Sequence, residues 1–308
     1  MFFTEQDNII HGMLCNNSYR LRELLKTDPC KKGYEQTNAR EYYVATILDE
    51  IIKFLTSVIR WEDDFKDGFD KEKERTLLGN LIIQGFNSEI NLYLRKLIES
   101  LINLILWSQI KDDNYIKYYY LMKKHSTIKR KLADLLEFYN IEPQHLKVDL
   151  HNIQHEIVSL FPLIDESKCF FLDLTKKPKA ILGTSIHWIE SSLKYRLKNA
   201  LKITDNLGKI LIGFTYENYS ITSEKVHFST TLDSQPSEIL ITTIRFVFAV
   251  ISKLTVLCAQ WLDVGDLNEF KRVERALSGG SQKLQLGIPH YYKTYMILMI
   301  MFILQMAS

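Results

Sequence analysis

Hydrophobic residues recur along most of this chain at intervals of three or four positions, the spacing that places side chains on one face of an α-helix. The stretch 38–61 shows the pattern clearly and predicts an amphipathic helix of several turns. Its apolar positions are Tyr43, Ile47, Ile51, Phe54, Leu55 and Val58. The charged run that follows, Glu62–Asp70, predicts a solvated loop.

The same pattern predicts further helices along the rest of the chain. They fall at about 71–109, 115–139, 142–161, 184–203, 205–227 and 238–262. The later half of the 71–109 stretch is apolar on most faces, so we expect this helix to cross the centre of the protein. Asp112–Asn114 breaks it from the next helix, and Pro143 suits the first turn of the helix after that. Periodicity fails between 162 and 183, where CFFLDL could form a short strand and where a subdomain boundary is expected.

These elements predict an all-α fold, an up-and-down helical bundle. Only 12 Gly and 6 Pro are present, too few for the tight turns of a many-stranded β architecture. We divide the chain into an N-terminal helical segment (1–70), a helical core (71–265) and a C-terminal helical tail (266–308). The alternative is that all three form one compact domain.

Composition narrows the class of protein. Hydrophobic residues make up 46% of the chain, enough for a sizeable core, and Lys plus Arg exceed Asp plus Glu by only 39 to 37. This balance does not predict a long electrostatic footprint for duplex nucleic acid. The four cysteines form no C-x-x-C pair, and the first residues lack the pattern of a secretory signal. We therefore expect reduced thiols and a cytoplasmic location.

Tyr295–Ala307, YMILMIMFILQMA, is the most hydrophobic segment. A membrane-spanning helix needs about 20 apolar residues, and this one is shorter and contains Gln305. A transmembrane span is not expected. A core helix or an interface with a protein partner or a second copy is favoured over peripheral contact with a membrane.

Common catalytic motifs are absent from the sequence. It contains no G-x-x-x-x-G-K-[ST] phosphate loop, no G-x-G-x-x-G, no G-x-S-x-G, no H-E-x-x-H and no Cys/His zinc spacing. Neither a cofactor nor a bound metal is therefore expected.

Two candidate site residues lie in the predicted central helix. Arg95 and Glu99 are four residues apart, so they share a face and can pair with each other. Leu92, Leu97, Ile98 and Ile102 nearby indicate that part of this face is buried. The pair is either an ion pair at a helix crossing or a site in which Arg95 binds an anion and Glu99 orients a neighbour.

Three more candidates form a ladder on a later helix. Tyr219, Ser223 and His227 follow one another at four-residue spacing and stack along one face. A hydroxyl one turn before an imidazole can fix its tautomer, and a histidine held in this way can act as a general acid or base. The alternative is a buried polar ladder that joins two helices.

Two weaker patterns lie between these candidates. His151 and His155 share a helical face with spacing that suits a metal, with His145 nearby, but their charged surroundings favour a solvated face. The basic run 123–131 also favours a solvated face, with nucleic-acid binding as the alternative because Tyr118–Tyr120 precede it.

The segments L-R-K-L-I-E (Leu94–Glu99) and Y-x-x-x-S-x-x-x-H (Tyr219–His227) resemble a bacterial family of uncharacterised helical proteins near the HEPN superfamily, the nucleotide-binding helical domains of higher eukaryotes and prokaryotes. The resemblance covers roughly 76–262. It implies a HEPN-like bundle with extra N- and C-terminal helices, in which the helix of Arg95 packs against the helix of His227. Many relatives in the wider superfamily resemble metal-independent ribonucleases of toxin, abortive-infection or antiviral defence systems.

This chain departs from the superfamily pattern at one point. Those ribonucleases have an Arg four to six residues before the His, and no His here has an Arg at that spacing. If Arg95 replaces that arginine, His227 would act as base toward a ribose 2′-OH and Arg95 would stabilise phosphate charge. Two hypotheses follow: an effector that cleaves RNA or processes a nucleotide, and a non-catalytic helical interaction or oligomerisation module.

Overall fold

The computed structural model of the chain describes residues 4–25, 38–66, 77–110, 113–163, 193–209, 211–213 and 237–277. Their elements are α1 (Glu5–Leu24), α3 (Ala39–Lys66), α4 (Leu77–Trp107), α5 (Asp113–Tyr139), α6 (Gln144–Leu160), the 3-10 helix η3 (Phe161–Leu163), α7 (Leu193–Ile203), α9 (Ser237–Leu262) and α10 (Leu267–Leu277). None of these residues lies in a strand. The prediction of an all-α helical bundle is confirmed.

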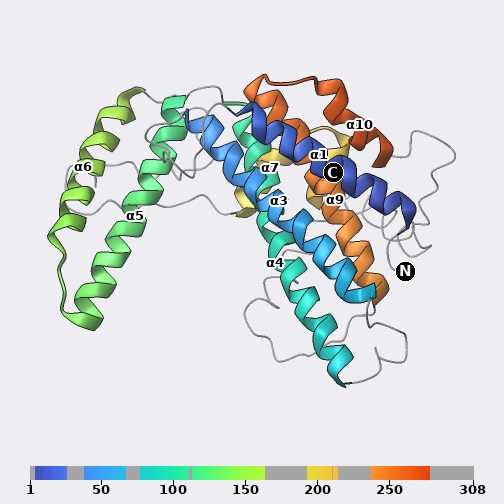
Figure 1. Cartoon of the computed structure of the whole chain (residues 1–308). Coiled ribbons are helices and arrows are strands. Elements are labelled where there is room, and N and C mark those ends of the chain that lie inside the picture. Colours follow the sequence, from blue (N-terminus) through green and yellow to red (C-terminus); the bar gives the residue numbers. More distant parts are fainter. Residues whose placement is uncertain are drawn as a thin grey trace.

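Helix α9 lies at the centre of a helical body, where it packs against α1, α3, α4 and α10 (Figure 1). Helix α4 crosses the same region and contacts α3, α7 and α9, which agrees with its apolar sequence. The core between them contains fully buried Phe54, Trp61, Trp107, Phe248 and Phe270. Burying side chains of this size supplies much of the energy that holds such a body together.

One continuous hydrophobic cluster runs through the described helices, from Ile10 of α1 to Val273 of α10. It contains residues from all three segments into which we divide the sequence. The boundaries at 70/71 and 265/266 stay predictions, beside the alternative of one compact domain.

The start of α1 is tied to α9 by a buried carboxylate. Thr4 caps the helix, accepting from the Asp7 backbone N–H at 3.2 Å while its own N–H donates to Asp7 Oδ2 at 2.8 Å. Asp7 is 1% exposed and also accepts from Arg245 of α9, whose Nε and Nη2 lie 2.8 and 2.7 Å from its two oxygens. Burial would raise the pKa of Asp7, but the hydrogen bonds from Arg245 and Thr4 outweigh it and lower that pKa.

Helices α5 and α6 form a hairpin that stands apart from the body (Figure 1). We call this pair, residues 113–160, the arm. Among the described elements α6 contacts only α5 and η3. Asn140 takes the left-handed conformation with φ 52° and so ends α5, and Pro143 follows three residues later.

An aromatic cluster anchors the base of the arm to the body. The ring of Trp107 (α4) lies 5.3 Å from those of Tyr115 and Tyr119 (α5), and 6.4 Å from that of Trp261 (α9). The Trp261 Nε1–H donates to the backbone oxygen of Ile110 at 3.0 Å, just before α5 begins. Because three helices contribute to this cluster, α5 leaves the body in a fixed direction.

Several predicted helix ends differ from the structure. Residues 62–66 continue α3 instead of forming a loop, and Asp113 and Asn114 already belong to α5. Pro143 is the residue before α6 and not a member of its first turn. Helix α1 is not among the predicted elements. The proposed strand at 169–174 lies outside the described residues.

In the part of the chain that the structure describes, one stretch, Thr243–Leu262 of α9, has the length and hydropathy of a membrane-crossing helix. It is 67% buried by other helices, as expected for the central helix of a bundle. This finding is weakly consistent with the expectation of no transmembrane span.

Candidate functional site

The structure describes two of the five predicted site residues. Arg95 and Glu99 lie one turn apart on α4, with Arg95 Nε 3.6 Å from Glu99 Oε1. Tyr219, Ser223 and His227 lie outside the described residues, and so does the Tyr295–Ala307 segment. That the helix of Arg95 packs against the helix of His227 therefore stays a prediction.

The Arg95–Glu99 pair lies at the edge of the core. The side chains are 25% and 37% exposed, whereas Leu97 and Ile98 between them are buried. Leu92, which we expected on the buried part of this face, is 43% exposed. Both charged groups therefore reach solvent, and an ion pair of this kind within one helix contributes only about 0.3–0.5 kcal/mol to stability.

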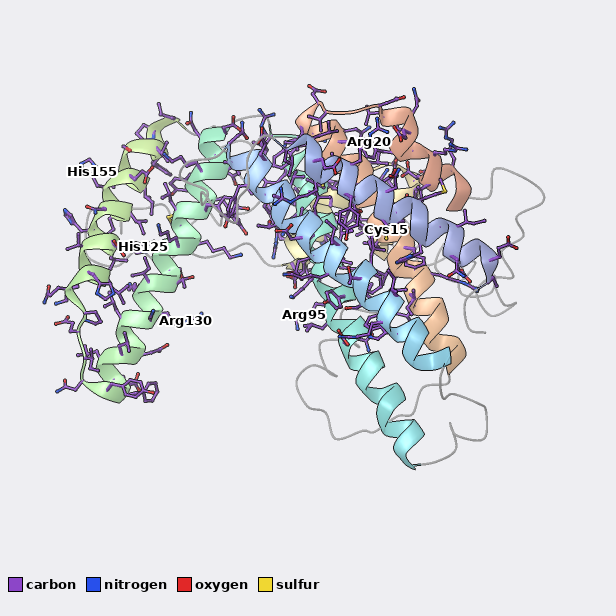
Figure 2. All side chains as sticks on the ribbon, viewed as in Figure 1. Cys15, Arg20, Arg95, His125, Arg130 and His155 are labelled. Atoms are coloured by element: carbon purple, nitrogen blue, oxygen red, sulfur yellow. The ribbon has the colours of Figure 1, made fainter. Side chains whose placement is uncertain are left out.

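An ion-pair group of three residues joins α4 to α3 beside this pair. Glu50 of α3 accepts from Lys96 and from Lys53, each at 3.0 Å. Burial would raise the pKa of Glu50, but the two ammonium groups outweigh it and lower that pKa. Figure 2 shows that Arg95 lies on the body, well away from His125, Arg130 and His155 on the arm.

The histidines of α6 fit the solvated-face interpretation. His145, His151 and His155 are all exposed. Among the described residues no three His, Cys, Asp or Glu side chains converge as metal ligands. The i, i+4 spacing of His151 and His155 thus has no third ligand nearby in this part of the chain.

The tyrosines that precede the basic run do not support its interpretation as a nucleic-acid site. Tyr118 and Tyr119 are only 3% and 4% exposed, because they pack into the core at the base of the arm. Tyr120 is half-buried, and its ring packs edge-on against those of Tyr42 and Tyr43, 5.4 and 6.2 Å away. Tyr118 and Tyr119 therefore offer no stacking surface for a base, although Lys123, Arg130 and Lys131 are exposed as predicted.

His125 differs from the rest of the basic run, which we predicted to be solvated. It is 1% exposed and faces α6, where its Nε2 lies 3.2 Å from the side-chain nitrogen of Gln154. Because the amide nitrogen is the donor, Nδ1 carries the ring proton, and this nitrogen has no hydrogen-bond partner among the described residues. Burial, and secondly the charge of Lys129, lowers the pKa of His125.

A polar pocket of about 230 Å³ lies between α4, α9, α10 and the turn after α7. Lys253 of α9 reaches it with a side chain only 5% exposed, and its Nζ lies 2.5 Å from Asp205 Oδ2 and 3.2 Å from Glu274 Oε1. Burial would raise the pKa of Asp205, but Lys253 and the Gly208 N–H outweigh it and lower that pKa. The lysine is neutralised by two carboxylates, which suits a structural ion cluster better than an anion site.

A second buried cation lies where α7 packs against α4. Arg196 is 7% exposed, and its Nη1 donates to Asn103 Oδ1 at 2.6 Å. Asn103 also hydrogen-bonds to Tyr43, whose pKa is raised above its usual range chiefly by burial. Neither Lys253 nor Arg196 is among the site residues predicted from the sequence. The signal available for Lys253 is a single lysine inside the apolar run of α9.

Cys15 and His11 share a face of α1, but they do not form a reactive pair. Cys15 Sγ lies 3.7 and 3.9 Å from the two ring nitrogens, and His11 Nε2 lies 2.9 Å from the backbone oxygen of Leu55. Burial raises the pKa of the Cys15 thiol, so the nucleophilic thiolate is disfavoured.

The tip of the arm carries a group of exposed apolar side chains that the sequence analysis does not single out. Seven of the fourteen large apolar side chains found exposed in the described residues lie between 136 and 163. They are Leu136, Phe138, Tyr139, Ile141, Val148, Val158 and Leu163, with exposed fractions from 41% to 70%. We call Leu136, Phe138, Tyr139, Ile141 and Val148 the apolar tip.

Comparison of the chain with protein-family models, with curated proteins and with solved structures found no match.

Proposed function

We propose that the protein is a non-catalytic helical interaction module that binds a partner through its arm. The observation that carries this proposal is the apolar tip. Phe138 and Tyr139 are 70% and 69% exposed and are the last two residues of α5, which ends where the arm is farthest from the body (Figure 1). Apolar side chains grouped on a projecting surface are typical of protein interaction sites.

The apolar tip is separate from the buried side chains of the arm. The buried apolar side chains of the two helices are others, among them Ile128, Leu146, Ile153 and Ile157. Folding of the hairpin thus leaves the tip in water. A solvent-exposed group of this kind gains stability only when another surface covers it.

The arm is also held in a way that favours binding. The aromatic cluster around Trp107 fixes the base of α5, and Lys117 of α5 pairs with Glu156 of α6. A binding surface that is ordered before contact loses less conformational entropy when the complex forms. The arm therefore presents its tip as a rigid projection.

Site-specific photo-crosslinking in cells tests this proposal. A photoreactive amino acid at Phe138 should give a covalent adduct with a defined protein, and the same amino acid at Ile59 of α3 should not. Ile59 is the matched control because it is an apolar residue 50% exposed on the body. Absence of an adduct from position 138, or the same adduct from both positions, would contradict the proposal.

A second candidate function is an effector of a bacterial defence or stress system that cleaves RNA or processes a nucleotide. The resemblance of Leu94–Glu99 and Tyr219–His227 to HEPN-like proteins motivates it. It is supported by the partial exposure of Arg95 and Glu99, because an anion can reach an arginine that is 25% exposed. In this function His227 is the base and Arg95 stabilises the phosphate.

Expression in bacteria separates the second candidate from the first. Wild type should slow growth and degrade RNA under conditions that trigger the system, whereas Arg95→Ala and His227→Ala should not. Arg60→Ala is the control, because Arg60 also forms a surface ion pair, with Glu89 at 3.0 Å, but is not a candidate site residue. Equal growth and intact RNA for all four proteins would remove the effector.

A further inference from the structure

We propose that the partner of the arm is a second copy of this chain, docked arm against arm in antiparallel orientation. This inference rests on the proposed interaction function and specifies its partner. It comes from the order of charges along the outer face of α5, together with the apolar tip.

The outer face of α5 carries a stripe of five exposed residues with the spacing of helical turns. In order from the body toward the tip they are Lys123, Thr127, Arg130, Asp134 and Glu137. Steps of four and three residues place them on one line along the helix. The two charged residues nearer the body are cations and the two nearer the tip are carboxylates, so the two halves of the stripe have opposite charge.

The sequence around the stripe has the same asymmetry. Residues 114–133 contain six Lys and Arg residues and no Asp or Glu, whereas residues 134–149 contain four Asp and Glu residues and one Lys. Within the described residues Lys123, Arg130, Asp134 and Glu137 make no ion pair. All four charges are therefore available to another molecule.

A two-fold axis that lies between two antiparallel α5 helices, level with residue 132, brings Arg130 of one copy next to the carboxylates of the other. With a rise of about 1.5 Å per residue, the centres of the two halves lie roughly 14 Å apart along the helix. An antiparallel copy then places Arg130 beside Asp134 and Glu137 of the other chain, twice by symmetry. A parallel copy would place like charges together.

The apolar side chain nearest to this stripe belongs to the same contact. Phe138 follows Asp134 by one turn, so it lies beside the acidic half of the stripe. In the antiparallel pair it meets the region of Thr127 and the aliphatic part of Lys131 in the second copy. An apolar centre with a charged rim is the usual composition of a protein interface.

The charges at the tip of the arm argue against a nucleic acid or an anionic membrane as its partner. A nucleic acid or an anionic membrane would be attracted by residues 123–131, but it would also meet Asp134, Glu137 and Asp149 around the apolar tip. These carboxylates repel phosphate where the exposed rings would have to enter. A second copy offers an opposite charge to the basic half and to the acidic half of the stripe at the same time.

Sedimentation velocity of the full chain at a series of protein concentrations tests the inference with charge-reversal variants. Lys123→Glu with Arg130→Glu gives an all-acidic stripe, and Asp134→Lys with Glu137→Lys gives an all-basic one. Each variant alone should dimerise at least about tenfold more weakly than wild type, and the two mixed together should form a heterodimer. The wild-type dimer should weaken as NaCl is raised from about 0.05 to 0.5 M, because opposite surface charges are screened.

Lys194→Glu with Lys198→Glu on α7 is the matched control, since both lysines are exposed and lie one turn apart on the body. This variant should dimerise as wild type does, and circular dichroism should show the same helix content for all variants. A wild-type chain that stays monomeric, a dimer unchanged by both arm variants, or a mixture that forms no heterodimer would overturn the inference. So would binding of the monomer to phosphatidylserine vesicles or to a single-stranded RNA that is lost in Lys123→Glu with Arg130→Glu.

The cross-link at position 138 distinguishes failure of this inference from failure of the proposed function. An adduct with twice the mass of the chain supports both. An adduct with a different protein keeps the interaction function and removes the second copy as partner. No adduct removes both.

Discussion

The body and the arm are built from the same kind of amphipathic helix, but they use it differently. In the body the helices α1, α3, α4, α9 and α10 each meet two or more neighbours, and side chains such as Phe54 and Phe248 are completely or almost completely buried. In the arm α6 meets only α5 and η3 among the described elements, so one face of each helix is covered and the rest stays in water. Apolar residues in the body therefore stabilise the fold, whereas those of the apolar tip do not.

Two phenylalanines test this difference most directly. Phe54→Ala should lower the free energy of unfolding by about 3–5 kcal/mol, because the side chain is fully buried among Trp61, Tyr93 and Phe248. Phe138→Ala removes the same atoms from a site that is 70% exposed and should change the free energy of unfolding by less than about 0.5 kcal/mol. Urea unfolding followed by circular dichroism measures both. Similar losses would mean that the tip is part of the stable core.

The next largest effect concerns the ion pair between α1 and α9. Asp7→Asn keeps the shape of the side chain but removes the charge that faces Arg245, and we expect a loss of about 2–3 kcal/mol near pH 7. The lowered pKa of Asp7 means that the unfolded chain binds the proton first as pH falls. The stabilisation is therefore fully present above pH 4 and is lost as pH falls further.

Unfolding of wild type and Asp7→Asn between about pH 7 and pH 3 measures this contribution. The stability curves of the two proteins should converge toward the acid end. Asp49→Asn is a control, since Asp49 also pairs with an arginine, Arg22 at 3.2 Å, but is 32% exposed. Parallel curves for wild type and Asp7→Asn would show that the buried pair does not stabilise the body.

The sequence predicted the fold better than the site, for reasons visible in particular residues. Periodic apolar positions located α3, α4, α5, α6 and α9, because burial of one helical face leaves a local signal. Helix α1 was missed, although Thr4 and Asp7 form a capping box that can be recognised in the sequence.

The chemistry of the site depends on contacts between distant segments, which no local pattern records. Lys253 meets Asp205 and Glu274 only because α9, α10 and the turn after α7 come together. His125 looked like part of a solvated basic run, yet the packing of α6 buries it. The exposure of Phe138 likewise depends on tertiary packing, because none of the helices that the structure describes, other than α6, packs against α5 at the tip.

A pair of glycines provides a smaller test within the body. Gly265 has φ 72°, and a Cβ there would lie 2.7 Å from the ring of Phe270 and 3.2 Å from Leu24. Gly265→Ala should cost about 1–3 kcal/mol through backbone strain and overlap. Gly12→Ala on α1 meets no atom within 4 Å and should stabilise the protein by about 0.5–1 kcal/mol. Thermal unfolding measures both, and the same sign for the two variants would contradict the packing at Gly265.

The smallest expected effect is the loss of stability of the arm when His125 is protonated. It occurs at a higher pH than the loss caused by protonation of Asp7 in the body. The pKa of His125 is lowered by burial and by Lys129, so the folded arm favours the neutral ring. The resulting stability is present above the ordinary histidine value of about 6.5 and is lost as pH falls below it. Protonation would also turn Nε2 into a donor facing the donor nitrogen of Gln154. The groups near the ring that set this response are therefore Lys129 and Gln154.

Amide hydrogen exchange between about pH 7 and pH 5, corrected for the intrinsic pH dependence of exchange, detects this change. Protection of α6 should fall in wild type while protection of α9 is unchanged, because the buried carboxylate of Asp7 titrates only at lower pH. His125→Gln cannot be protonated and should abolish the pH dependence of α6. His155→Gln is the control, since His155 is exposed on the same helix pair. If α6 and α9 lose protection together, the arm and the body unfold as one unit, and the contrast between them concerns burial alone.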